Sequence, residues 1–181
     1  MTLLHLQLMA AGALVLIAAI VDFKTGKIPN LLIAIGLALG LLSGAAVGFA
    51  SDRAGAVLHG LLYSSAGALG CALLPGLLYA ARSIGGGDLK LFIALGSLVG
   101  PLIGLEAELY TFCAGALYVF GLLAYEGILF RSVADSFVAV SSAIVRRPNR
   151  RAAQLSQRSV RFGPLIAVGT WLALLAHWSG S

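Results

Sequence analysis

Six apolar runs constrain this chain more than any other feature of its sequence. A helix that crosses a bilayer needs about 20 mostly apolar residues. Backbone polar groups in lipid must be satisfied within the segment, so we expect these runs to be helices. They lie at about 3–21, 31–49, 56–80, 91–105, 109–130 and 163–178, with the fourth and sixth runs short. The sequence therefore predicts an all-α integral membrane protein, a bundle of six transmembrane helices.

The composition supports this class. The chain has 181 residues, of which 60% are hydrophobic and 10% are charged, whereas soluble domains carry about 25% charged residues. We therefore predict a single membrane-embedded domain over residues 1–181, with one long polar connection at about 131–162. No Lys or Arg precedes the first apolar run, so that run is predicted to stay as a span and not to act as a cleaved signal peptide.

The basic residues predict the orientation of the bundle. Eleven of the twelve lie on the first, third and fifth connections: Lys24, Lys27, Arg82, Lys90, Arg131, Arg146, Arg147, Arg150, Arg151, Arg158 and Arg161. The even connections hold Arg53 and the acidic pair Glu106 and Glu108. Cytoplasmic loops carry the excess of Lys and Arg, so we expect both termini outside. The net charge of +5 is then a topology signal and not evidence for nucleic-acid binding.

Glycines recur at a spacing of four along two of the runs: Gly36, Gly40, Gly44 and Gly48 in the second, and Gly96, Gly100 and Gly104 in the fourth. Such stripes let helix backbones approach closely in lipid. We interpret them as packing surfaces within the chain, and a dimer interface is the alternative.

Two aspartates, Asp22 and Asp88, stand at the cytoplasmic ends of predicted spans. A carboxylate in or near hydrocarbon is costly and usually has a function. The predicted topology brings both to one membrane face although 66 residues separate them. Two carboxylates that share a site do not both ionise easily. One can then take a proton from water while the other donates a hydrogen bond to a peptide carbonyl, which is the arrangement of an aspartic protease.

The residues around the two aspartates fit such a site. Three consecutive glycines before Asp88 permit unusual backbone angles and the approach of an extended substrate. Proline suits the first turn of the second span, the asparagine after it can cap or bind nearby, and two lysines either act on the aspartates or mark the membrane boundary. The predicted site-shaping residues are Gly85, Gly86, Gly87, Lys27, Pro29, Asn30 and Lys90. The plainer reading pairs Asp22 and Asp88 with Lys27 and Lys90 as interfacial ion pairs.

The motifs resemble those of a known family. Asp22 followed by Lys27-Ile28-Pro29-Asn30, then Gly85-Gly86-Gly87-Asp88-Leu89-Lys90, look like the type IV prepilin peptidases, intramembrane aspartic proteases of the Gly-x-Gly-Asp class. The segment Phe162-Gly163-Pro164 is similar to the opening of that family's last span. The resemblance implies that Asp22 and Asp88 are the catalytic pair. It also implies removal of the leader of a prepilin or pseudopilin, on the cytoplasmic side of the inner membrane.

Larger members of that family carry a cytoplasmic Cys-x-x-Cys domain and methylate the new amino terminus. This chain has two cysteines, Cys71 and Cys113, both in apolar runs. It therefore resembles the compact branch associated with Flp/Tad pili, or the similar archaeal preflagellin peptidases. The resemblance implies peptidase activity without methyltransferase activity. We expect no cofactor and no metal.

A different class of function remains open. Glu126 lies within a predicted span and is read as a partner of Arg131 or, alternatively, as a proton relay. Intramembrane acids and glycine-rich helices also occur in small ion-coupled transporters and membrane scaffolds. A transporter would need a buried acid at the midplane of the membrane, and a scaffold would tolerate the loss of either aspartate.

Overall fold

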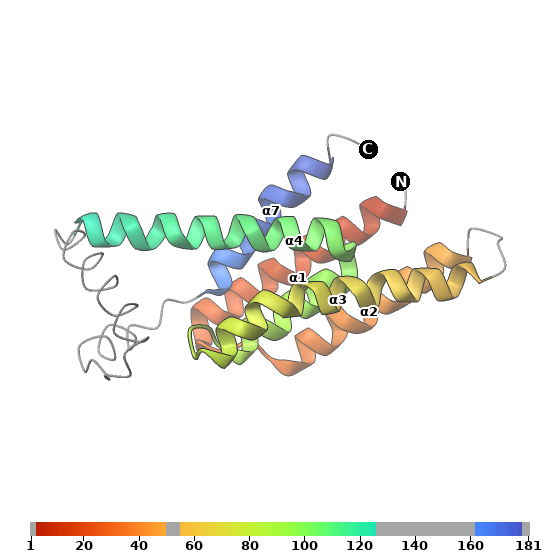
Figure 1. Cartoon of the computed structure of the whole chain (residues 1–181), viewed down its shortest axis with the longest axis horizontal. Coiled ribbons are helices and arrows are strands. Elements are labelled where there is room, and N and C mark those ends of the chain that lie inside the picture. The colour runs from red at the N-terminus through yellow and green to blue at the C-terminus, as the bar shows by residue number, and fades with distance from the viewer. Residues whose placement is uncertain (1–2, 50–54, 126–161, 179–181) are drawn as a thin grey trace, which may run out of the picture. The chain divides into compact units, whose positions relative to one another are not determined.

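Helices make up all the regular structure of residues 3–49, 55–125 and 162–178, which are the residues that the computed structural model describes (Figure 1). They are α1 (Leu3–Thr25), α2 (Asn30–Phe49), α3 (Ala56–Ala80), α4 (Gly86–Tyr125) and α7 (Gly163–Trp178). In these ranges α1 to α4 are long and apolar enough to cross a membrane, and α7 is a shorter apolar helix. The all-helical membrane class is confirmed, while six spans and outside termini stay predictions.

Two compact units divide the chain. The first contains residues 1–113 and 161–181, and the second contains residues 114–160. The described part of the second unit is the end of α4, up to Tyr125. Glu126 and residues 131–161 of the predicted polar connection lie outside the described residues. All the packing and the sites below belong to the first unit.

The chain turns back inside α4 at Gly100. Gly100 has φ 79° and ψ 177°, a conformation that is essentially restricted to glycine, and Pro101 follows it. A Cβ placed on Gly104 would lie 3.1 Å from the Cα of Gly96, whereas eight residues of straight helix span about 12 Å. The predicted fourth span, 91–105, therefore contains this turn. Within the first unit, the residues after Gly100 run back along those before it, and Phe112 stacks on Phe92.

This turn corrects the predicted position of the acidic pair. We expected Glu106 and Glu108 on a connection, but both lie on α4, beyond the turn. Glu106 contacts the Nε2 of His177 on α7 at 2.7 Å. Glu108 is buried, and neither of its carboxylate oxygens has a hydrogen-bond partner within the described ranges. The turn forms at Gly100 because glycine accepts a positive φ and the residue before a proline disfavours the helix.

Antiparallel packing joins α1 to α7. The ring of His5, near the start of α1, meets that of Trp178, at the end of α7, with centroids 4.8 Å apart. At the other end of the pair, Asp22 contacts Gly163, the first residue of α7. The buried core between the helices is built mainly from aliphatic side chains, with Phe92 as its largest fully buried member.

The glycine stripe of α2 packs within the chain, as predicted. The helices α2 and α3 run side by side (Figure 1), and the Ser64 hydroxyl of α3 donates to the Gly40 carbonyl at 3.1 Å. A methyl group added at any of the four glycines would collide with a neighbouring helix: Gly36 with Leu14, Gly40 with Ser97, Gly44 with Gly60 and Ser64, and Gly48 with Ala56. Close backbone approach is therefore the role of this stripe.

Candidate active site

A tight turn after α1 forms one wall of the candidate site. Gly26 has φ 67° and donates its N–H to the Asp22 carbonyl at 2.8 Å, which is a common way to end a helix. The Thr25 hydroxyl lies 2.9 Å from the carbonyls of both Val21 and Lys27. Pro29 then accepts the N–H of Leu32 at 3.1 Å as α2 begins. The turn places Lys27 and Asn30 beside the end of α1.

The first turn of α4 forms the opposite wall. The Gly85 carbonyl accepts the Leu89 N–H at 3.3 Å, so Gly85 is the cap of the helix and Asp88 is its third residue. Asp88 reaches back, and its Oδ2 accepts the Gly85 N–H at 3.3 Å. A carboxylate at this position satisfies a free N–H and interacts favourably with the helix dipole.

The three glycines before Asp88 act through space and not through unusual backbone angles, which corrects our expectation. None of them is among the described glycines with positive φ, which are Gly26, Gly55 and Gly100. A Cβ on Gly86 would meet the ring of Tyr79 at 3.3 Å, and one on Gly87 would meet Ile28 at 3.4 Å. Because these glycines have no side chains, they leave open space beside Asp88.

A cavity of about 350 Å³ separates the two walls, and both aspartates line it. The structure thus brings Asp22 and Asp88 together from helices far apart in the sequence, as the sequence predicted. The lining residues are Asp22, Gly26, Lys27, Ile28, Asn30, Gly85, Gly86, Gly87 and Asp88. Of the predicted site-shaping residues, Pro29 and Lys90 are not in the lining. Lys90 acts at its edge, where its Nζ donates to the Asn30 Oδ1 at 3.0 Å.

The two aspartates interact with each other and not with the lysines. Asp22 and Asp88 are close enough to repel each other electrostatically. Within the described residues neither Lys27 nor Lys90 forms an ion pair with them. The plainer reading of two lysine–aspartate ion pairs is therefore not what the structure shows: among the described residues Lys27 shares the cavity with the carboxylates without pairing with them, and Lys90 bonds to Asn30.

Asp22 has one partner that the sequence reasoning did not assign. The side chain of Asp22 is 7% exposed, and its Oδ2 accepts the N–H of Gly163 at 3.2 Å. Gly163 begins α7, 141 residues further along the chain. The Phe162-Gly163-Pro164 motif indicated that the start of the last span is important, but the sequence did not show that this segment would contact Asp22.

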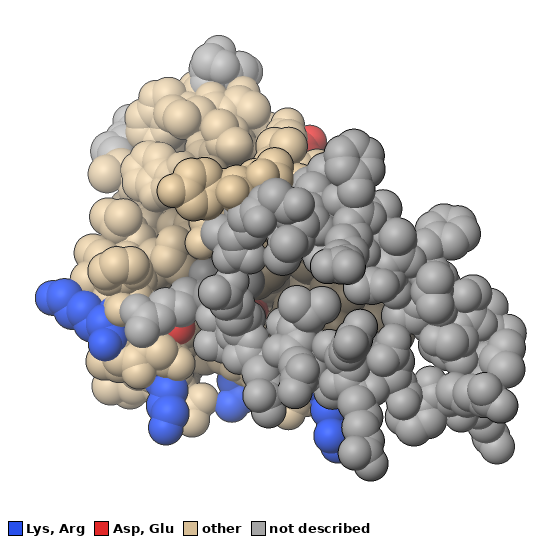
Figure 2. Space-filling view, turned by 90° about the vertical axis from the view of Figure 1, so that its left-hand side faces the viewer, with Lys and Arg blue, Asp and Glu red and all other residues tan. Residues whose placement is uncertain are grey.

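Basic residues gather at the same end of the helices as this cavity. The Lys and Arg residues in the described ranges are Lys24, Lys27, Arg82 and Lys90, all at or just beyond the ends of α1 and α3 and the start of α4. Figure 2 shows blue side chains along the lower part of one face, with red carboxylates visible among them. This grouping agrees with the charge asymmetry seen in the sequence.

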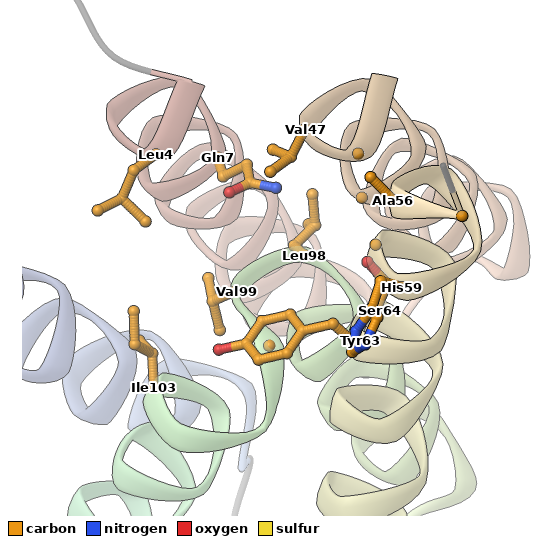
Figure 3. Close-up of a pocket in the computed structure, with 15 residues that line it drawn as sticks. Leu4, Gln7, Val47, Ala56, His59, Tyr63, Ser64, Leu98, Val99 and Ile103 are labelled. Carbon is orange, nitrogen blue, oxygen red and sulfur yellow. The ribbon is translucent and has the colours of Figure 1, made fainter. Parts of the chain in front are cut away.

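A second cavity, of about 560 Å³, lies near the opposite end of the helices, and the described residues that line it include no carboxylate. Figure 3 shows Tyr63 extending across it toward Val99 and Ile103, with Gln7 and His59 at its rim. The Gln7 amide is already bonded to Ser43 at 3.1 Å. The smaller cavity is the candidate active site because two aspartates line it, whereas the described lining of the larger cavity has no such pair.

A comparison with family models agrees with this geometry. The model of the type IV leader peptidase family matches residues 9–120, a stretch that includes both aspartates and the three glycines. No curated protein and no solved structure matches the chain. The family match covers more than half of the chain and contains the whole cavity lining, so this multi-pass membrane protein belongs to the type IV leader peptidase family.

Proposed function

We propose that this protein is an aspartic endopeptidase that removes the leader of prepilins or pseudopilins at the cytoplasmic face of the inner membrane. The observation that carries the proposal is that Asp22 and Asp88, from α1 and α4, line one cavity. The family match supports leader peptidase activity. The aspartate pair supports the aspartic type, because two adjacent carboxylates are the groups that such proteases use.

The chemistry follows from two carboxyl groups that share one proton. The ionised carboxylate takes a proton from a water molecule, whose oxygen attacks the carbonyl carbon of the scissile peptide. The protonated carboxyl gives its proton to the carbonyl oxygen, so a neutral diol forms. The diol then collapses as the carbon–nitrogen bond breaks. The leaving nitrogen receives a proton from the carboxyl that gained one from water, and a diol hydroxyl returns its proton to the other carboxylate, which restores the starting dyad.

The location of the cavity supports a substrate with a scissile bond next to a hydrophobic helix. The cavity lies where α1 ends and α4 begins, so a peptide that leaves the bilayer at this face passes the two carboxylates. Gly86 and Gly87 have no side chains, which leaves room for the extended backbone of a substrate. A prepilin has this arrangement, a polar leader followed by an apolar helix, and the motif resemblance favours an Flp/Tad-type pilin.

The test is a leader-cleavage assay with purified protein and a candidate prepilin. We expect Asp22→Asn and Asp88→Asn each to lower the cleavage rate by roughly 100-fold or more, because asparagine preserves shape and does not exchange the proton. Lys24→Gln, a charge change on α1 outside the cavity lining, is the matched control and should cleave normally. Near-normal cleavage by either well-folded aspartate variant would refute the dyad.

We further propose that cleavage is not followed by methylation of the new amine. The turn between α1 and α2 is short, from Gly26 to Pro29, and chains below about 40 residues rarely fold alone. Mass spectrometry of a pilin processed by this protein with S-adenosylmethionine present should show a free amine. A gain of one methyl group that depends on this protein would contradict the proposal.

One observation favours the transporter alternative. Glu108 is a buried carboxyl within a membrane-crossing helix, and neither oxygen has a partner among the described residues. Under the peptidase proposal Glu108→Gln retains cleavage, since Glu108 does not line the aspartate cavity. Ion flux in reconstituted vesicles that is lost in Glu108→Gln would instead support transport.

A further inference from the structure

The two aspartates do not have equivalent surroundings. Both accept a backbone N–H at the start of a helix, but Asp88 uses the exposed N–H of its own cap residue, Gly85. Asp22 accepts the N–H of Gly163 in a contact that is buried. A hydrogen bond to a carboxylate is stronger where water is excluded. The buried contact should therefore favour an ionised Asp22 more than the exposed contact favours an ionised Asp88.

The start of α7 directs its positive end at Asp22. The Ile166 N–H donates to the Phe162 carbonyl at 3.0 Å, so Phe162 is the cap of α7 and Gly163 is its first residue. Pro164 has no N–H to offer. The Gly163 N–H is unpaired by the helix itself, and the helix dipole adds to its attraction for an anion. Asp22 thus serves as a capping acceptor supplied by another helix.

Glycine is required at position 163 for space. A Cβ there would lie 2.6 Å from the Oδ2 of Asp22, 2.8 Å from its Cβ and 3.0 Å from its Cγ. Gly163 is not among the described glycines with positive φ, so backbone strain is not the reason. The carboxylate packs directly on the Gly163 backbone, and any side chain would push the carboxylate away from the N–H.

A series of aromatic rings fixes the start of α7 relative to α4. Phe92, one helical turn after Asp88, stacks on Phe112 with centroids 5.9 Å apart. Phe112 in turn contacts Phe162, the cap of α7, at 6.1 Å. Through Phe162 and Gly163 this series links the helix that carries Asp88 to the carboxylate of Asp22. The first residues of α7 therefore contact both Asp22 and the ring series that leads to the helix of Asp88.

We propose that Gly163 is a positioning residue that holds Asp22 ionised as the general base of the dyad, leaving the shared proton on Asp88. This inference rests on the proposed peptidase function and goes beyond it by assigning the two roles. Within the described residues, the titratable groups around Asp22 are Asp88 and Lys27, which share its cavity, Lys24 further along α1, and Tyr79, which packs against Gly86.

The test compares Gly163→Ala with Gly169→Ala on the same helix. A Cβ on Gly169 would overlap the Thr111 hydroxyl and lie 2.6 Å from the Thr111 Cα, so this control disturbs the packing of α7 without touching Asp22. We expect Gly163→Ala to lower kcat roughly 10- to 100-fold with little change in KM. Gly169→Ala should lower thermal stability and leave the pH profile of the folded enzyme in place.

The pH profile of kcat/KM separates the two role assignments. Weakening a hydrogen bond to a carboxylate makes that carboxylate harder to ionise. If Asp22 is the base, Gly163→Ala moves the acidic limb of the profile to higher pH, by about one unit. Movement of the basic limb, or an unmoved profile, would overturn the assignment. The aspartate variants test the dyad itself, whereas the pH profile of Gly163→Ala tests only which aspartate is the base. The role assignment can therefore fail while the proposed peptidase function stands.

A measurement on the unaltered chain covers the case in which Gly163→Ala does not fold. Carboxyl carbon NMR of the protein labelled at aspartate can follow both groups, with Asp22→Asn and Asp88→Asn used to assign the signals. We expect the Asp22 signal to keep its ionised position at pH values where Asp88 carries the proton. The reverse order would refute the proposal.

Discussion

Lys90 donates a hydrogen bond from its Nζ to the Oδ1 of Asn30 at 3.0 Å. The contact joins the second turn of α4, just after Asp88, to the first residue of α2. It lies at the edge of the aspartate cavity and is exposed. Both residues were predicted to shape the site, and the structure shows that they bond to each other.

This pair predicts a modest, coupled effect on activity. Lys90→Gln and Asn30→Ala should each lower the cleavage rate by roughly 2- to 10-fold, the range expected for the loss of one exposed hydrogen bond. The double variant should cleave at about the rate of the less active single variant, because both changes break the same contact. Strictly additive losses in a double-mutant cycle would show that the two side chains act separately.

Gly87→Val should impair cleavage more than it impairs folding. A Cβ at this position would meet Ile28 at an ordinary contact distance of 3.4 Å, so the helix tolerates it, but the added methyl groups enter the cavity. Gly76→Val, where an added Cβ meets nothing within 4 Å, is the matched control on α3. Cleavage per folded molecule should fall in the first variant and not in the second, and equal rates would exclude a close approach of substrate at Gly87.

Gly40→Ala should destabilise the fold because its Cβ would overlap Ser97. We expect a loss of thermal stability in detergent that corresponds to about 1–3 kcal/mol of overpacking. Gly76→Ala should be neutral or slightly stabilising, since alanine favours a helix over glycine by about 1 kcal/mol. If the two variants melted alike, the stripe on α2 would not be a tight packing surface.

Gly100→Ala should be among the most damaging single changes in the chain. The backbone conformation at Gly100 is costly for any other residue, by about 1–3 kcal/mol, and the added Cβ would also overlap the Tyr63 ring. Tyr63→Ala in the same background removes the overlap and leaves the strain. Partial recovery of stability in the double variant is therefore expected, whereas full recovery would mean that the backbone angle itself carries no cost.

Both termini should lie outside the cytoplasm. The charge asymmetry predicts this orientation, and a labelling experiment can measure it. In a background with Cys71→Ala and Cys113→Ala, a single cysteine in place of Ser181 should react with an impermeant maleimide added to intact cells. A cysteine in place of Thr25, at the end of α1, should react only after lysis. The opposite pattern would reverse the orientation.

Local sequence was sufficient to place most of the helices. Their observed bounds agree with the predicted runs for α3 and α7, and α2 begins one residue earlier than predicted. Hydrocarbon leaves the backbone no alternative partners, so an apolar run of the right length becomes a helix wherever it packs. The glycine stripe of α2 was equally legible, because its spacing of four puts all its members on one helix face. The predicted stripe of Gly96, Gly100 and Gly104 along one helix was wrong, because the turn at Gly100 interrupts the helix and brings Gly104 against Gly96.

The turn at Gly100 was misplaced for a local reason. The acidic residues at 106 and 108 were taken to mark a polar connection. Both residues instead lie on α4, where Glu108 is buried and Glu106 contacts His177. The Gly100–Pro101 pair was the better marker, because it limits backbone angles directly, whereas polarity can be satisfied or tolerated inside a packed bundle.

The sequence by itself determined the class of this protein and its principal helices, and it predicted that Asp22 and Asp88 share one site. Each of these depends on residues close together along the chain or on a motif within one segment. Only the tertiary structure decided that α7 supplies an N–H to Asp22 and that Lys90 bonds to Asn30. Those contacts join residues 141 and 60 positions apart. Their geometry arises from the packing of whole helices, which no local pattern encodes.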